Sequence, residues 1–172
     1  MTATRAAGRS ARRPAATTSQ APGAHGPAPA AVVADSGPLI ALFNRADAWH
    51  NPIVGWLKRH PQVRLVSTWA VATEVCALLA RRVGNGAALD FLRWIDRGGL
   101  ELDTPEPGTS LREVLRVSVR FADLPFDLAD ASVAEAAGRL KITHVLTIDA
   151  DFDVYRDRDG RPLTRVPDAA RR

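Results

Sequence analysis

The chain has 172 residues, of which 46% are apolar, and this suits one domain with a single core better than a two-domain enzyme. The formal net charge of +4 is no sign of a basic folded face, because residues 1–31 contain four arginines and no acid and the rest balances 19 basic against 19 acidic residues. The single cysteine, Cys76, excludes an intramolecular disulfide and a cysteine-based zinc site, and the lack of an apolar run of roughly 18 residues argues against a transmembrane helix. We therefore expect a cytoplasmic protein.

The first 30 residues are predicted to be a disordered extension, since they are rich in Ala, Pro and Arg and have almost no large apolar side chains. The folded domain is expected over residues 31–168. Residues 169–172 are expected to be a flexible C-terminus.

Strands and helices alternate along the folded part. A β-branched strand ends before Asp35 and leads through a turn into a short helix. Further helices are predicted over 48–59, 69–82, 84–99 and 110–123, the last opened by Ser110, and from 127 onward, with strands over 63–68, 100–104, 144–148 and 163–166. This order predicts an α/β fold with a mainly parallel sheet covered by helices on both faces. In such sheets ligands bind beyond the carboxyl ends of the strands.

Two aspartates, Asp35 and Asp149, follow apolar strand segments directly. Because parallel strands end at the same edge, both carboxylates should emerge on the binding edge of the sheet. Either residue alone could equally be an ordinary turn former.

Glu74 lies at the border of the apolar stripe of its predicted helix, beside Val71 and Leu78. A carboxylate there is hard to hydrate, so it needs hydrogen-bond donors, a cation or a metal. The alternatives are a salt bridge to an arginine such as Arg81 or Arg82, or a carboxylate that simply reaches solvent.

Asp127 and Asp130 stand three residues apart at the start of an alanine-rich helix. Asp127 is placed to be the N-cap, with an additional ligand role left open. Asp130 borders the apolar stripe and is the better candidate for a charge directed into the fold. Carboxylates gathered at one edge would repel one another without a cation, and hard oxygen ligands suit Mg²⁺ or Mn²⁺, which favours phosphoryl chemistry.

Four segments in order resemble the motifs of the PIN-domain ribonucleases, especially the VapC-like toxins of type II toxin–antitoxin systems. They are "VVADSGPLIALF", "STWAVATEVCALL", "FDLADASVAEAA" and "VLTIDADF". The resemblance extends from about Val32 to Val166, and it implies a PIN domain over residues 31–168 with a three-layer α/β/α fold and a five-stranded sheet in the order 3-2-1-4-5.

The resemblance also implies a site and an activity. Asp35, Glu74, Asp130 and Asp149 would be the catalytic residues and would surround one or two Mg²⁺ or Mn²⁺ ions, with Asp127 as a fifth candidate ligand and Ser36 and Thr147 in support. The implied reaction is endonucleolytic hydrolysis of RNA that leaves a 3′-hydroxyl and a 5′-phosphate. The implied partners are an RNA substrate, a cognate antitoxin and a second copy of the chain, with no membrane.

Two other functions are kept open. The chain could be a catalytically weak PIN-like module that binds RNA or protein, with its acids serving as caps. A haloacid-dehalogenase-like phosphatase would need a second aspartate at the position that Gly37 occupies.

The chain has four tryptophans, Trp49, Trp56, Trp69 and Trp94. For these residues, a place in the core or at a partner interface is favoured over base stacking.

Overall fold

The sheet confirms the predicted topology. The structure is a computed structural model that describes residues 28–105, 108–125 and 127–167, so most of the predicted extension and the predicted flexible C-terminus lie outside the described residues. Its five strands all pair in parallel, in the order β3-β2-β1-β4-β5. The strands are β1 (Ala31–Ala34), β2 (Arg64–Thr68), β3 (Glu101–Asp103), β4 (His144–Leu146) and β5 (Thr164–Val166).

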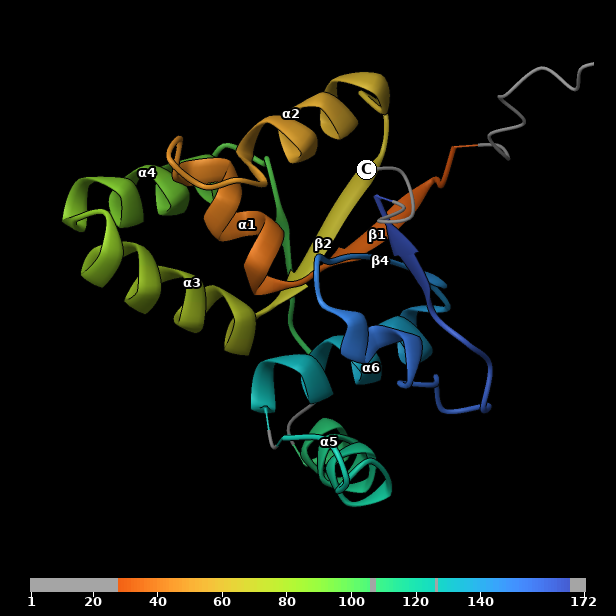
Figure 1. Ribbon diagram of the computed structural model, residues 1–172. Helices are drawn as coiled ribbons and strands as arrows, with labels where there is room; N and C mark the ends of the chain where they lie inside the picture. The colour runs from red at the N-terminus through yellow and green to blue at the C-terminus, as the bar shows by residue number, and fades with distance from the viewer. Residues whose placement is uncertain (1–27, 106–107, 126, 168–172) are drawn as a thin grey trace, which may run out of the picture.

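Helices cover both faces of this sheet and give the predicted three layers (Figure 1). One layer holds α1 (Ser36–Phe43), α2 (His50–Arg59), α3 (Trp69–Arg82) and α4 (Asn85–Asp96). On the other side α6 (Leu128–Leu140) lies against β1, β2 and β4, and α5 (Thr109–Arg120) packs outside α6. A 3₁₀ turn, η1 (Ala150–Asp153), follows β4. Within the described ranges, no helix is both long and apolar enough to cross a membrane.

The composition of α6 explains how closely it approaches the sheet. Nine of its residues are buried, and most of them are alanine, glycine or serine. Small side chains let a helix backbone pack close to the valines of β1, which are buried on both sides as expected for a central parallel strand. The start of α6, with Asp130, is thereby held at the carboxyl edge of β1 and β4.

Some boundaries differ from the sequence prediction. Ser110 does not open its helix: α5 begins at Thr109 with Gly108 as the N-cap, at a positive φ of 82° that favours glycine. The Ser110 side chain is buried instead, and its hydroxyl has no hydrogen-bond partner among the described residues. The strand predicted over 144–148 ends at Leu146, because Thr147 uses its side chain to shape the following turn.

An ion-paired cluster ties α6 to the edge strand β3. The guanidinium of Arg139 donates through Nε to Glu135 at 2.8 Å and also to both carboxylate oxygens of Asp103. The three side chains are largely withdrawn from solvent, so each charge depends on the others for compensation.

Replacing Arg139 by methionine should therefore destabilise the domain by about 3 kcal/mol, because two poorly solvated carboxylates lose the cation that they share. Urea unfolding followed by circular dichroism measures this. The control is Arg93→Ala, which breaks the exposed Arg93–Asp90 pair and should cost no more than about 0.5 kcal/mol. Equal effects of the two substitutions would contradict the assigned role of the cluster.

Candidate active site

Asp35 is fixed between the first and fourth strands. It is 4% exposed and caps α1, with its Oδ1 accepting from the backbone N–H of Ser36 at 2.6 Å. Its Oδ2 accepts from the Thr147 hydroxyl at 2.9 Å, and its own N–H donates to the Leu146 carbonyl at 3.0 Å. Ser36 thus contributes its backbone, whereas Thr147 contributes its side chain.

Thr147 also positions the next acid. Its Oγ1 accepts from the backbone N–H of Asp149 at 3.0 Å, and the Oδ1 of Asp149 accepts from the N–H of Asp151 at 2.8 Å, which starts η1. Asp149 is exposed, in contrast to Asp35. One threonine hydroxyl therefore couples the two predicted aspartates.

Glu74 lies on α3 and is half-buried, as its place at the stripe border predicted. Its Oε2 is buried and has no hydrogen-bond partner in the described part of the chain. The alternative of a salt bridge to Arg81 or Arg82 is wrong, since neither pair occurs among these residues. An orphaned buried carboxylate oxygen is costly and is a position that a cation would satisfy.

The two acids of α6 differ as the helical geometry predicted. Asp127 is the N-cap, and its Oδ1 accepts from the backbone N–H groups of Ala129 at 2.7 Å and Asp130 at 3.2 Å. Asp130 lies in the first turn and is half-buried.

The electrostatics place the predicted acids in one neighbourhood. Burial raises the pKa of Asp130, and together with the negative charges of Asp35, Asp127, Asp149 and Glu74 it brings the value to about 8. Burial also raises the pKa of Asp35 to about 6, against the opposing hydrogen bonds from Thr147 and Ser36, with the charges of Glu74 and Asp149 adding to the rise. The carboxylates therefore share a site and repel one another.

The chemistry of this donor set fits a hard divalent cation. All five side chains offer carboxylate oxygens, one oxygen of Glu74 is orphaned, and the raised pKa values report uncompensated negative charge. Among the described residues, however, no three His, Cys, Asp or Glu side chains already form a group arranged to hold an ion.

Buried hydroxyls join the elements that bear these acids. The Ser67 hydroxyl donates to the Ala34 carbonyl at 2.7 Å, which ties β2 to β1 next to Asp35. The hydroxyls of Thr68 and Ser132 lie 2.7 Å apart and link the start of α3 to α6. These bonds fix the α3 helix with Glu74 relative to the α6 helix with Asp130.

Gly37 lies against the loop of the fourth acid. A Cβ built on Gly37 would lie 2.9 Å from a side-chain carbon of Ile148, so a larger side chain at this position would require the Ile148 side chain to shift. The position of the second aspartate that the phosphatase hypothesis needs is thus occupied by a glycine that packs closely against Ile148.

Sequence reasoning missed two residues beside the acids. Tyr155 is buried, and burial together with the charges of Asp130 and Asp127 raises its pKa to about 12. Arg165 on β5 donates to both carboxylate oxygens of Asp153 at 2.7 Å and to the Asp149 carbonyl at 3.3 Å. No local sequence pattern indicates a role for either residue, because each lies near the acids only when the segment after η1 packs against them.

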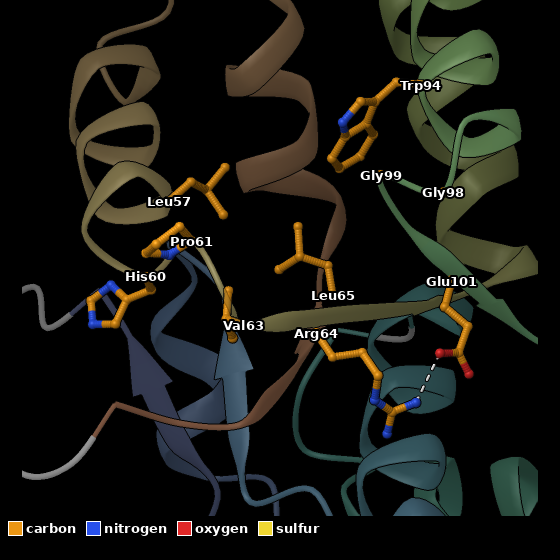
Figure 2. Close-up of a pocket in the computed structure, with 10 residues that line it drawn as sticks. All are labelled: Leu57, His60, Pro61, Val63, Arg64, Leu65, Trp94, Gly98, Gly99 and Glu101. Atoms are coloured by element: carbon orange, nitrogen blue, oxygen red, sulfur yellow. Dashed lines mark hydrogen bonds and ion pairs between the residues drawn. The ribbon is translucent and has the colours of Figure 1, made fainter.

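A pocket of about 440 Å³ lies at the other end of the sheet, where β2 and β3 begin (Figure 2). Leu57 and Trp94 line it, and Arg64 pairs with Glu101 at 2.8 Å across one side. None of the predicted site residues lines this pocket. The concentration of carboxylates, rather than this hollow, marks the candidate active site.

The fold and the site define the class of the protein: an α/β domain of PIN-like topology with carboxylates from four segments at the carboxyl edge of its sheet. No protein-family model matches the chain. The chain is similar to the curated protein Ribonuclease VapC26 of Mycobacterium tuberculosis, with 28% identity over 137 residues that cover 79% of this chain and 100% of that protein.

Two solved structures share the fold. The crystal structure of Mycobacterium tuberculosis VapC20, described as a sarcin–ricin loop cleaving toxin, matches with a TM-score of 0.65 and 20% identity over 72% of this chain and 93% of that one. VapBC2 from Rickettsia felis, bound to a DNA fragment from its promoter, matches with a TM-score of 0.55 and 11% identity over 78% and 96%. The resemblance to VapC-type PIN-domain proteins is thereby confirmed.

The raised pKa of Asp130 predicts a pH-dependent stability. In the folded protein the Asp130 carboxyl group stays protonated up to about pH 8, whereas in the unfolded chain it loses its proton near pH 3.8. The stability that the neutral carboxyl group contributes is therefore lost as the pH rises from about 3.8 to about 8. Without metal, Asp130→Asn should raise the melting temperature by several degrees at pH 8.5 and by little at pH 4.

Differential scanning fluorimetry in EDTA from pH 4 to 8.5 tests this prediction. Asp96→Asn, a change at an exposed acid on α4, is the control and should leave the wild-type pH profile unchanged. A difference between wild type and Asp130→Asn that does not grow with pH would contradict the assigned burial of charge.

Proposed function

We propose that the protein is a Mg²⁺- or Mn²⁺-dependent endoribonuclease and the toxin of a toxin–antitoxin pair. The main observation in support is the shared electrostatic neighbourhood of Asp35, Glu74, Asp130 and Asp149, which come from four segments of the chain. The names of the similar proteins, a ribonuclease and a sarcin–ricin loop cleaving toxin, support the same activity.

In this proposal the four acids would hold one or two ions, with Asp127 as a candidate fifth ligand. When bound, the metal supplies Lewis-acid stabilisation of the phosphodiester and a water of lowered pKa. The chain's own contribution is orientation and desolvation: Thr147 and the N–H of Ser36 each hold one oxygen of Asp35, and burial of Asp35 keeps bulk water from that carboxylate. The expected products are a 3′-hydroxyl and a 5′-phosphate.

The binding-module alternative also has a specific observation in its favour. Asp35, Asp127 and Asp149 are all N-caps, a role that stabilises helices whether or not a metal binds. A module of this kind would bind RNA or protein without cleaving it. The two functions differ in whether Mn²⁺ binds tightly and whether RNA is cut.

The activity test uses the purified full chain free of any partner. With Mg²⁺ or Mn²⁺ it should cleave total RNA. Asp35→Asn and Asp130→Asn should each lower the rate at least roughly 100-fold, because each replaces a negatively charged metal ligand by a neutral amide. Asp96→Asn is the matched control at an exposed acid and should cleave as wild type does.

Isothermal titration with Mn²⁺ separates the two functions. The nuclease hypothesis expects binding heat that Asp35→Asn abolishes and Asp96→Asn retains. If the wild type neither binds Mn²⁺ nor cleaves RNA, the nuclease hypothesis is wrong and the binding-module alternative stands.

We further propose a cognate antitoxin and a homodimer as partners. The antitoxin rests on the similarity to VapBC2. For the homodimer, α5 offers an unusual surface: Val114 and Val117 face the core, yet Leu111, Leu115 and Val119 on a second stripe are 69%, 61% and 68% exposed. Three large apolar residues at four-residue spacing form a continuous face of the kind that a second copy covers.

Replacing Leu115 by glutamate in the centre of this stripe should convert the dimer to a monomer, because the charge would be desolvated on association. Light scattering coupled to size exclusion measures the mass. Leu89→Glu, at an exposed leucine on α4, is the control and should stay dimeric. A wild-type monomer, or a Leu115→Glu variant of unchanged mass, would contradict this interface.

A further inference from the structure

Trp69 differs from the other tryptophans of the chain. Trp56 is buried, and Trp49 and Trp94 pack partly buried against the core, in agreement with the place favoured from the sequence. Trp69 is 59% exposed. Among the described residues, no aromatic ring stacks on its indole. A tryptophan with this much exposed area offers a flat, rigid aromatic surface to a ligand.

The backbone of Trp69 lies close to that of Asp35. The pairing of β1 with β2 sets Val33 opposite Val66, and extending this register by two residues brings Asp35 level with Thr68. Neighbouring strands lie about 4.8 Å apart and consecutive Cα atoms 3.8 Å apart, so the backbone of Trp69 is roughly 9 Å from that of Asp35. One or two nucleotides of an extended RNA strand span this distance.

The anchoring of Trp69 is rigid on both sides. The Thr68 side chain caps α3 and meets Ser132 of α6 at 2.7 Å, two residues after Asp130. The Trp69 carbonyl accepts from the Thr73 hydroxyl at 2.8 Å one turn further along α3. Trp69 is therefore presented from a fixed point between the segments that bear Asp35 and Asp130, with its side chain toward solvent.

We propose that Trp69 is a stacking platform for an unpaired nucleobase next to the phosphate that is cleaved. This inference rests on the proposed nuclease function and adds a residue that contacts the substrate: Trp69 would hold a base that is unpaired and unstacked at the cleavage site. A neutral aromatic face suits the location, because a base can stack on it without bringing a phosphate other than the cleaved one close to the carboxylates. Any of the four bases can stack on an indole, so Trp69 would hold the RNA strand in one conformation without selecting its sequence.

The test uses a single-stranded RNA that the wild type cleaves at one site, together with a set of copies in which one nucleotide at a time is replaced by an abasic ribose. For the wild type, one abasic position within two nucleotides of the cleaved bond should raise KM about 5- to 100-fold, the range expected for one stacked base. In Trp69→Ala the intact RNA should show this raised KM with little change in kcat. In this variant the abasic replacement should cause no further rise in KM.

Three controls keep the outcome specific. Trp69→Phe retains an aromatic face and should retain the abasic penalty, whereas Leu89→Ala, at an exposed residue of α4, should change neither constant. Melting temperatures check that Trp69→Ala is folded. If Trp69→Ala cleaves with unchanged KM, or keeps the full abasic penalty, the inference is wrong.

Two further outcomes also decide the matter. A Trp69→Ala variant with altered mass or lost binding to a protein partner, but with unchanged KM for RNA, would overturn the inference and make Trp69 a protein contact. Failure of the proposed function is distinguishable, because then wild type and Asp35→Asn would be equally inactive on every RNA and the abasic comparison would show no cleavage at all.

Discussion

Mutual repulsion among buried carboxylates is the constraint on which the arrangement of this molecule depends. Desolvation, together with the charges of the neighbouring acids, raises the pKa of Asp35 to about 6 and that of Asp130 to about 8. A free chain would not bring these charges together, so burial of apolar surface elsewhere must hold them in place. The valine-rich central strand and the small residues of α6 provide that burial.

The parallel sheet partly offsets this repulsion. Since every strand ends at the same edge, the helices that follow begin there, and the starts of α1, α3, α6 and η1 all lie near the acids. The positive ends of helix dipoles and their unpaired N–H groups favour negative charge, by roughly 0.3 to 1 kcal/mol each at exposed sites. The pKa values of Asp35 and Asp130 are nevertheless raised, so desolvation and repulsion exceed this stabilisation.

Much of this organisation could be predicted from the sequence, because it depends on local patterns. The alternation of strands and helices gave the parallel sheet, and helical spacing distinguished Asp127 as a cap from Asp130 as a partly buried charge. The roles of Thr147, Tyr155 and Arg165 could not be predicted in the same way. Thr147 bonds a residue 112 positions away, and the other two reach the site through a loop whose path depends on tertiary contacts. The prediction that Ser110 opens its helix is wrong for a related reason. The Ser110 side chain is buried, and the turn at Gly108 starts the helix at Thr109 instead.

The capping hydrogen bonds also help to decide whether these acids stabilise helix starts, bind a metal, or do both. Asp127 uses Oδ1 for both of its N–H donors, and Asp149 uses Oδ1 for Asp151. In the described part of the chain no hydrogen bond is made by the Oδ2 of either residue, and the Oε2 of Glu74 is likewise unpaired. A carboxylate has two oxygens with about four lone-pair sites, so one oxygen can satisfy a helix start while the other stays available to a cation. Cap and ligand are therefore compatible roles for the same residue. Helix capping explains how these aspartates are oriented, and the buried, unpaired Oε2 of Glu74, rather than the caps, is what requires a further explanation such as a bound cation.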